Sequence, residues 1–151
     1  MIRPLRTADV PSLAAALARL PLLVRYRRDA GRLARDLEEA AAGGDGVLVE
    51  ERDGRVRGLA WFQRSGTLGL GGYLRLLAVV GEATGEGIGA TLLAACEAEV
   101  ARESRHAFLL VSDFNEGAQR FYERHGYARV GVLPGLVLPD VGEVVYWKRL
   151  R

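Results

Sequence analysis

The sequence predicts a mixed α/β fold with a mostly antiparallel sheet and one parallel pair of strands, flanked by about four helices. Two observations predict it: a hairpin signal in the first half of the chain and a strand–helix–strand unit over 72–113. A strand that returns to the same sheet through a helix lies parallel to its partner. With 151 residues, of which 49% are hydrophobic, the chain is long enough to build a core. We expect a single domain over 1–151.

Two helices are expected between the first strand and the hairpin. The strand covers 2–6. The first helix covers about 9–19, with Asp9 as its N-cap, and Pro21 ends it. The second helix covers 29–42 and stops at a pair of glycines, which are typical of a helix C-terminus.

The hairpin and the strand–helix–strand unit follow. The segment 47–64 contains two strand-like runs around Asp53-Gly54, which is a strong turn signal. The segment 72–80 is almost continuously apolar and predicts a strand that is buried on both faces. An apolar stripe at helical spacing then predicts a helix from near residue 85 to 102, followed by a buried strand at 106–114.

The end of the chain is predicted to add one helix and two strands. Asn115 is a suitable N-cap for this helix, and Gly126 ends it. The two strands cover about 127–133 and 143–149, and a loop rich in proline and glycine joins them.

The composition excludes several classes of protein. The net charge of +2 is too small to indicate nucleic-acid binding by itself. No apolar run approaches the roughly 20 residues of a membrane span, and the first ten residues do not resemble a signal peptide, so we expect a cytoplasmic protein. Cys96 is the only cysteine, which excludes an internal disulfide and argues against a zinc site. Its apolar neighbours at helical spacing indicate a buried thiol.

The glycine segment 83–93, ATGEGIGATLL, is a candidate anion site. It precedes a helix, whose first amides lack intrahelical partners and whose dipole favours negative charge. Gly85, Gly87 and Gly89 have no side chains to block a phosphate. The alternative is a turn that serves only helix packing. A dinucleotide fingerprint also matches Gly85 to Ala90, but no strand leads directly into it and the next acidic strand end, Asp113, comes too late.

Two motifs together indicate a family. The first is Gly-x-Gly at Gly87 and Gly89, and the second is Asn-x-x-Ala-x-x-x-Tyr-x-x-x-Gly-Tyr, made by Asn115, Ala118, Tyr122, Gly126 and Tyr127. Together with the order of elements, they resemble the GNAT superfamily of acyl-CoA-dependent N-acetyltransferases over nearly the whole chain. The family more often has phenylalanine where this chain has Tyr127.

The resemblance implies a binding site for acetyl-CoA as co-substrate, with no metal. In such proteins the central parallel strands splay apart, and the main chain of Leu77, Ala78 and Val79 would pair with pantetheine. The diphosphate would lie on the backbone amides of Gly85, Glu86, Gly87, Ile88, Gly89 and Ala90. Asn115 would face the cofactor, and Ala118 and Phe121 would line its pantetheine arm.

The resemblance assigns Tyr122 the role of general acid, which protonates the thiolate of coenzyme A as it leaves. A strand amide, most plausibly that of Val79, would stabilise the tetrahedral oxyanion. The residue pattern alone favours Tyr122 as a core residue, because its helix must bury one face. Asn115 is also explained as a helix cap, which is compatible with a contact to the cofactor. His125 is explained as a C-terminal helix residue that meets the helix dipole.

No proton acceptor for the amine is evident. Many relatives carry a glutamate on the central strand, where this chain has Arg75. The remaining carboxylates are more remote candidates, and an amine held close to the thioester needs only solvent as its proton acceptor. These candidates are Glu50, Glu51, Asp113 and Glu143.

The glycine segment departs from the family pattern in its charge. Thr84 stands where relatives carry arginine or glutamine, and Glu82 and Glu86 add two carboxylates. Negative charge near a diphosphate costs affinity unless it points into solvent. We therefore expect weaker coenzyme A binding than in relatives with a basic loop. An arginine cluster at 25–35 is a possible source of compensation and otherwise a solvated helix face.

The acceptor is expected to be a primary amine, either on a small molecule or on a protein. It would lie against the first two helices, the hairpin and the loop 134–142. Candidate lining residues, each of which is also explained as core, are Leu22, Leu23, Tyr26, Trp61 and Tyr146. An alternative function is a catalytically silent acyl-CoA sensor, and nucleic-acid binding is a distant third. Dimers are common in the family, and the sequence leaves the oligomeric state open.

Overall fold

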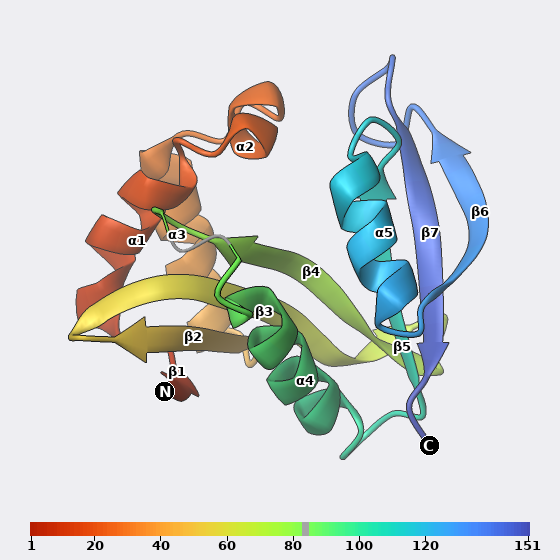
Figure 1. The fold of residues 1–151 in the computed structure, drawn as a ribbon, viewed down its shortest axis with the longest axis horizontal. Coiled ribbons are helices and arrows are strands. Elements are labelled where there is room, and N and C mark those ends of the chain that lie inside the picture. The colour runs from red at the N-terminus through yellow and green to blue at the C-terminus, as the bar shows by residue number, and fades with distance from the viewer. Residues whose placement is uncertain (83–84) are drawn as a thin grey trace. The chain divides into compact units, whose positions relative to one another are not determined.

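The strands of the computed structural model, which describes residues 1–82 and 85–151, form one sheet. Their order across it is β1-β2-β3-β4-β5-β7-β6 (Figure 1). The strands are β1 Ile2–Pro4, β2 Gly46–Arg52, β3 Arg55–Thr67, β4 Gly71–Val79, β5 His106–Ser112, β6 Ala128–Pro134 and β7 Gly142–Arg149. β4 and β5 pair in parallel, whereas β1 with β2, β2 with β3, β5 with β7 and β6 with β7 pair antiparallel. The predicted fold class is confirmed.

Five α-helices and one short 3-10 helix, at Thr7–Asp9, lie in the described part of the chain. The α-helices are α1 Val10–Leu17, α2 Pro21–Arg25, α3 Ala30–Ala42, α4 Ile88–Val100 and α5 Glu116–Arg124. The short helix α2 was not expected, because Pro21 was interpreted only as the end of the preceding helix. Proline is well suited to the first position of a helix, where its missing N–H has no intrahelical acceptor, and Pro21 begins α2.

The predicted cap of α5 is confirmed, α3 has a cap that was not predicted, and the predicted cap of α1 is wrong. Asp29 accepts a hydrogen bond from the amide of Arg32 at 2.8 Å, and Asn115 accepts one from the amide of Ala118 at 3.2 Å. The carboxylate of Asp9 does not cap α1. It accepts from the amide of Arg6 at 2.8 Å and belongs to an ion pair described below.

The chain divides into two compact units, each of which we describe by itself. The first comprises Met1–Phe62 and Leu76–Cys96, and the second comprises Gln63–Arg75 and Glu97–Arg151. The strands β3 and β4 and the helix α4 contribute residues to both units. That the chain acts as one domain stays a prediction.

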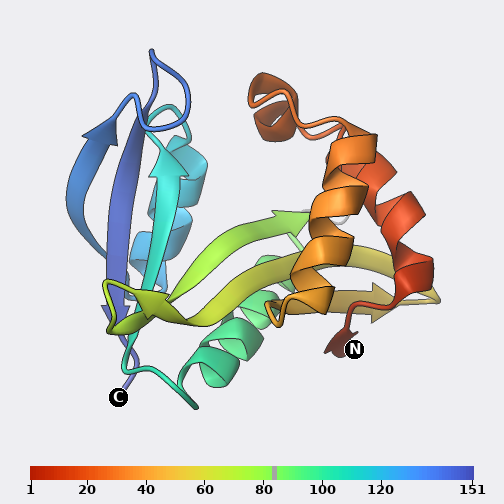
Figure 2. The ribbon, with the colours of Figure 1, turned by 180° about the vertical axis from the view of Figure 1, so that it is seen from behind.

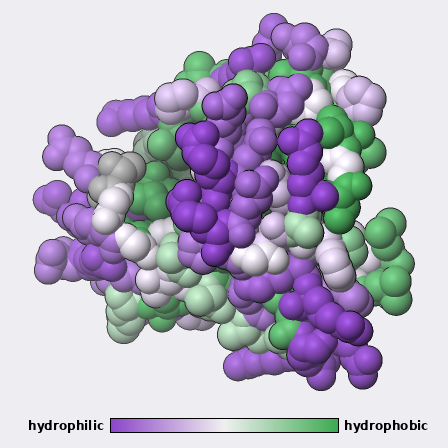
Figure 3. Space-filling view, turned by 45° about the vertical axis from the view of Figure 1, so that its right-hand side comes forward, coloured by the Kyte–Doolittle hydropathy of each residue, from purple (hydrophilic) through white to green (hydrophobic). Residues whose placement is uncertain are grey.

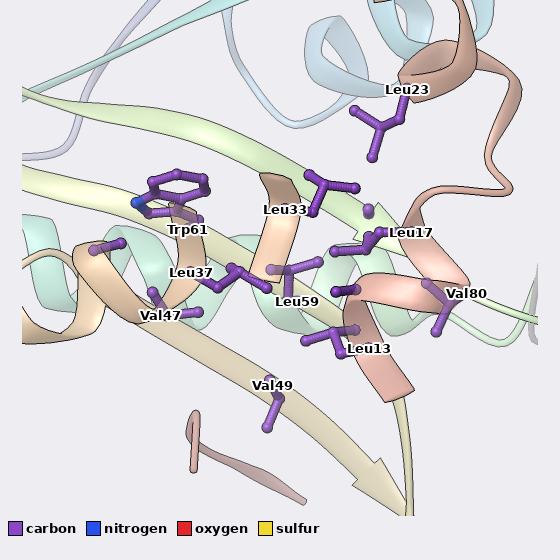
Figure 4. Packing of buried hydrophobic residues seen from close by; sticks show 13 residues of the cluster. Leu13, Leu17, Leu23, Leu33, Leu37, Val47, Val49, Leu59, Trp61 and Val80 are labelled. Atoms are coloured by element: carbon purple, nitrogen blue, oxygen red, sulfur yellow. The ribbon is translucent and has the colours of Figure 1, made fainter. Parts of the chain in front are cut away.

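In the first unit, α1 and α3 cover one face of β2 and β3, and α4 lies on the opposite face (Figures 1 and 2). The side chains of the two helices point toward those of the strands (Figure 4). The alternation along the strands explains the layering, since every second residue faces α1 and α3. The labelled members of this core are Leu13, Leu17, Leu23, Leu33, Leu37, Val47, Val49, Leu59, Trp61 and Val80.

Gly58 makes the contact with α4 possible. It lies on β3, on the face opposite to Leu59. A Cβ atom at this position would stand 2.7 Å from the carbonyl oxygen of Ala78 on β4, and 3.1 and 3.2 Å from the side chains of Leu92 and Ile88 on α4. Only glycine therefore lets β3, β4 and α4 approach this closely. Cys96, further along α4, is buried as expected.

A buried arginine ties the start of the chain to the hairpin. Arg3 on β1 donates from Nη1 and Nη2 to the two carboxylate oxygens of Asp9, at 2.7 and 2.9 Å. Its Nε also donates to Glu51 on β2. The hydrogen bond from Arg3 holds the pKa of Asp9 below its ordinary value despite partial burial. This network explains why Asp9 does not cap α1.

In the second unit, α5 packs on the face of the sheet formed by β5 and β7. Tyr146 on β7 is fully buried, and its hydroxyl donates to Glu123 on α5 at 2.8 Å. Burial, together with the Glu123 carboxylate, raises the pKa of Tyr146 above its ordinary value. α5 is thus attached to the sheet through a buried polar contact as well as through apolar packing.

The last turn of α4 is held by ion pairs of the second unit. Lys148 on β7 donates from Nζ to both carboxylate oxygens of Glu97 at 2.9 Å, and its ammonium lies 5.5 Å from the ring centroid of Tyr127. Arg64 donates to Glu99 at 3.2 Å. These contacts fix the carboxyl end of α4.

The surface is mostly hydrophilic on the face drawn in Figure 3, where hydrophobic residues form separate patches. All residues of β6, the last strand in the sheet order, are exposed. Among the residues that the structure describes, no helix has the length and apolar character needed to cross a membrane.

Candidate active site

The predicted cofactor residues of the first unit lie at the end of β4 and the start of α4. The parallel ladder pairs Gly71–Leu74 of β4 with His106–Leu109 of β5, and the segment Leu77–Val79 follows that ladder. Ala78 is buried in the core beneath α1 and α3. Because side chains alternate along a strand, Leu77 and Val79 face the other side.

The glycine segment turns sharply before α4. Gly85 and Gly87 have φ angles of 88° and 74°, a left-handed conformation that favours glycine. A Cβ atom added at either position would meet no atom of the described residues within 4 Å, so the space beside this backbone is open toward that part of the chain. The carbonyl of Gly87 accepts from the amide and the hydroxyl of Thr91 at 3.1 and 3.0 Å.

α4 therefore begins at Ile88. The start near Gly85 that the sequence indicated is wrong. Positive φ angles at Gly85 and Gly87 are incompatible with a right-handed helix. The amides of Ile88, Gly89 and Ala90 belong to the first turn, where helix geometry supplies no acceptor. These amides and the two left-handed glycines make the segment suitable for an anion.

Of the two glutamates that depart from the family pattern, Glu82 and Glu86, the second has a hydrogen-bond partner. Glu86 accepts from Nη1 of Arg52 at 3.1 Å, and Nε of the same arginine donates to Glu50 at 3.0 Å. Glu82 is exposed. Thr84, the other departure from the family pattern, lies outside the described residues. The local sequence around the glycines contained no sign of Arg52, which is 34 residues earlier in the chain.

The predicted residues of the second unit lie on α5. Asn115 caps this helix through Ala118, as described above, and Ala118 and Phe121 are half-buried. Tyr122 is 8% exposed. Its ring centroid lies 5.6 Å from that of Tyr127 and 6.4 Å from that of Tyr146. These aromatic contacts hold the ring of Tyr122 in one orientation.

His125 ends α5 and contacts its own helix. Its Nδ1 lies 2.7 Å from the carbonyl oxygen of Phe121, and the two rings are 4.4 Å apart. This is the C-terminal position that the sequence indicated.

The four remote carboxylates have different surroundings. Burial opposes ionisation of Glu50, but hydrogen bonds from the amino group of Met1 and from Arg52 outweigh it and lower the pKa of Glu50. A lowered pKa makes Glu50 a weaker proton acceptor. Glu51 is paired with Arg3.

The other two carboxylates lie in the second unit. Asp113 accepts from the amide of Gly142 at 2.8 Å, which anchors the end of the loop 134–142. Glu143 is buried on β7, opposite Ser112 of β5. Tyr73 on β4 has a raised pKa, caused mainly by burial and in part by the charge of Glu143.

Several candidate acceptor residues are core residues instead. Leu23 and Trp61 belong to the core of the first unit, and the indole N–H of Trp61 donates to Asp45 at 2.8 Å. Tyr146 is fully buried beneath α5. Leu22 and Tyr26 are half-buried. Within the described residues, no three metal-ligating side chains gather into a site.

The family follows from a comparison with family models. The model of the acetyltransferase (GNAT) family matches residues 15–127. The chain therefore belongs to the GNAT acetyltransferase family, and the predictions of the superfamily and of an acyltransferase are confirmed. A comparison with curated protein sequences gave no match.

Solved structures share the fold over the whole chain. An N-acetyltransferase from Staphylococcus aureus Mu50 has a TM-score of 0.81 at 19% identity, covering 100% of this chain and 98% of its own. A ribosomal-protein-alanine N-acetyltransferase from Brucella melitensis has a TM-score of 0.79 at 23% identity, and the match covers 99% of both chains. An aminoglycoside 6'-N-acetyltransferase complexed with coenzyme A has a TM-score of 0.80 at 21% identity. The match covers 100% of this chain and 97% of that protein. At these identities the likeness shows the fold alone.

Proposed function

We propose that this protein is an N-acetyltransferase that transfers the acetyl group of acetyl-CoA to a primary amine by direct attack in a ternary complex. The observation that carries the proposal is the open, left-handed glycine turn at Gly85 and Gly87, directly before α4. Such a turn suits a diphosphate. Family membership and the coenzyme A bound to the aminoglycoside 6'-N-acetyltransferase support the same cofactor.

The cofactor would contact residues of three segments. The main chain of Leu77, Ala78 and Val79 would pair with pantetheine, and Asn115, Ala118 and Phe121 would contact the cofactor from α5. The backbone amides proposed for the diphosphate are those of Gly85, Glu86, Gly87, Ile88, Gly89 and Ala90. These assignments rest on the family resemblance, and the backbone geometry of Gly85 and Gly87 supports the one for the diphosphate.

The chemistry needs one proton donor and one oxyanion donor. The neutral amine attacks the acetyl carbonyl, a C–N bond forms, and the carbonyl oxygen becomes an oxyanion that the amide of Val79 would stabilise. The C–S bond then breaks, and Tyr122 would protonate the leaving thiolate while the amine nitrogen loses its proton to solvent. The orientation of Tyr122 by its aromatic neighbours supports this role.

The acceptor is proposed to be an amine on a small molecule or on a protein. The two kinds occur in the names of structural neighbours, one of which acts on ribosomal-protein alanine and another on aminoglycosides. A screen of acetyl-CoA consumption over aminoglycosides, polyamines, amino acids and peptide N-termini tests both kinds. Binding of acetyl-CoA without turnover on any amine would favour the silent sensor instead.

The role of Tyr122 is tested by Tyr122→Phe, which removes only the hydroxyl. We expect kcat to fall about 100-fold, the lower end of the range for general acid catalysis, because a thiolate is a good leaving group. The matched control is Tyr127→Phe, which removes a hydroxyl from the neighbouring ring and introduces the residue that relatives commonly carry. Equal kcat in the Tyr122 variant and the wild type would exclude Tyr122 as the acid.

A further inference from the structure

The glycine segment carries negative charge where the proposed ligand is also negative. Glu82 and Glu86 lie on either side of Gly85, and Glu86 is itself among the residues proposed to contact the diphosphate. Negative charges close to a negative ligand raise the dissociation constant of that ligand. The family pattern has arginine or glutamine in the same segment, and this chain has Thr84 at that position.

A cation reaches this segment from a different element. Arg52 is the last residue of β2, next to the Asp53-Gly54 turn, and its Nη1 donates to Glu86 Oε2 at 3.1 Å. The pair is largely exposed, with 39% of the Arg52 side chain and 54% of the Glu86 side chain accessible. An exposed ion pair contributes little to stability. Its consequence lies in the charge that it places beside the glycine segment.

The position of Arg52 is fixed from the opposite side. Nε of Arg52 donates at 3.0 Å to Glu50, whose side chain is only 5% exposed. Glu50 is a strand residue of β2, and its lowered pKa keeps it ionised near neutral pH. The guanidinium therefore lies between the buried carboxylate of Glu50 and the carboxylate of Glu86, and the two hydrogen bonds hold it beside the glycine segment.

We propose that Arg52 is a positioning residue that compensates the charge of Glu86 and so allows the glycine segment to bind the diphosphate of coenzyme A. The inference rests on the proposed function. Arg52 supplies from the hairpin the positive charge that the segment itself lacks, and it acts through Glu86. The ion pair thereby replaces the basic residue of the family pattern.

A double-mutant cycle with Arg52→Gln and Glu86→Gln tests this in the full chain by calorimetric titration with coenzyme A. At 50 mM salt, Arg52→Gln is expected to raise the Kd about fivefold. A fivefold change in Kd corresponds to about 1 kcal/mol, the order expected for one uncompensated charge that acts on the ligand through partly screening solvent. Glu86→Gln is expected to lower the Kd, because it removes a negative charge beside the ligand, and the double variant is expected to bind within about twofold of the wild type.

Two further measurements separate charge from folding. At 0.5 M salt the effect of Arg52→Gln should shrink below about twofold, because exposed charges are screened. Arg102→Gln is the matched control: it removes an exposed ion pair with Glu99 at the carboxyl end of α4, at 3.2 Å, and should leave the Kd unchanged. If Arg52→Gln also lowers the melting temperature, Arg52→Lys separates the two effects. This variant keeps the charge and should bind coenzyme A with most of the wild-type affinity.

The outcomes are distinct. If the wild type binds coenzyme A and Arg52→Gln binds equally well, the inference fails and the proposed function stands. If Glu86→Gln weakens binding as much as Arg52→Gln, the pair acts as a mechanical anchor and charge compensation is refuted. If the wild type itself does not bind coenzyme A, the proposed function fails.

Discussion

Gly58 links the packing of the first unit to the proposed cofactor segment, and Gly58→Ala perturbs both. The added Cβ would stand 2.7 Å from the carbonyl oxygen of Ala78, against the 3.4 Å at which ordinary van der Waals contact begins. The same atom would press on Leu92 and Ile88, which are fully buried. The strand β4 must therefore shift at Ala78.

The cost follows from the packing. Overpacking a well-packed core by one methyl group costs about 1–3 kcal/mol. A loss of about 2 kcal/mol lowers the melting temperature of a chain of this size by about 4–8 °C. Because the main chain of Ala78 is proposed to pair with pantetheine, the KM for acetyl-CoA should also rise, by about threefold or more.

Thermal unfolding followed by circular dichroism and steady-state kinetics measure the two effects. The matched control is Gly117→Ala on α5, where an added Cβ meets nothing within 4 Å. That variant should be stabilised by about 0.4–1 kcal/mol, because alanine loses less backbone entropy on folding. A melting temperature for Gly58→Ala within about 1 °C of the wild type would refute the packing argument.

Two further predictions concern buried polar contacts. Asp9→Asn should destabilise the protein by about 2 kcal/mol at pH 7, because it breaks the paired hydrogen bonds from Arg3. Since Arg3 lowers the pKa of Asp9 below its ordinary value of 3.8, this stability is present above pH 3.8 and is lost as the pH falls through the folded-state pKa. Urea titrations at several pH values measure the difference in the free energy of unfolding between the wild type and Asp9→Asn. A difference that stays constant from pH 7 down to pH 3 would contradict this prediction. Tyr146→Phe should cost about 1 kcal/mol through the loss of the hydrogen bond to Glu123, and the same cost in a Glu123→Ala background, which has no side-chain acceptor, would contradict that cause.

Features encoded by neighbouring residues were predictable from the sequence. The hairpin turn is at Asp53-Gly54, and both residues have positive φ angles, as the tight turn that joins twisted strands requires. Asn115 caps its helix as predicted, because a cap involves residues only three apart. The positions of the two family motifs are equally local.

Features that depend on distant contacts were not predictable in this way. Asp9 matches the residue preference of an N-cap, but Arg3 draws its carboxylate away from α1. The five-residue helix α2 is too short for hydrophobic periodicity to reveal it. The partner of Glu86 lies 34 residues away in the sequence, and only the pairing of the folded strands shows that Gly58 admits no side chain.

Lys148 bears on how an acetylation assay would behave. It is the only lysine of the chain, its side chain is 26% exposed, and its amine is held by both oxygens of Glu97. An acetyltransferase with many accessible lysines slowly consumes its own acetyl donor and accumulates acetyl groups. This chain offers one internal amine, which is engaged in an ion pair, so the background of self-acetylation should be low. A mass shift on an added peptide or protein would then report the true acceptor with little interference from the enzyme.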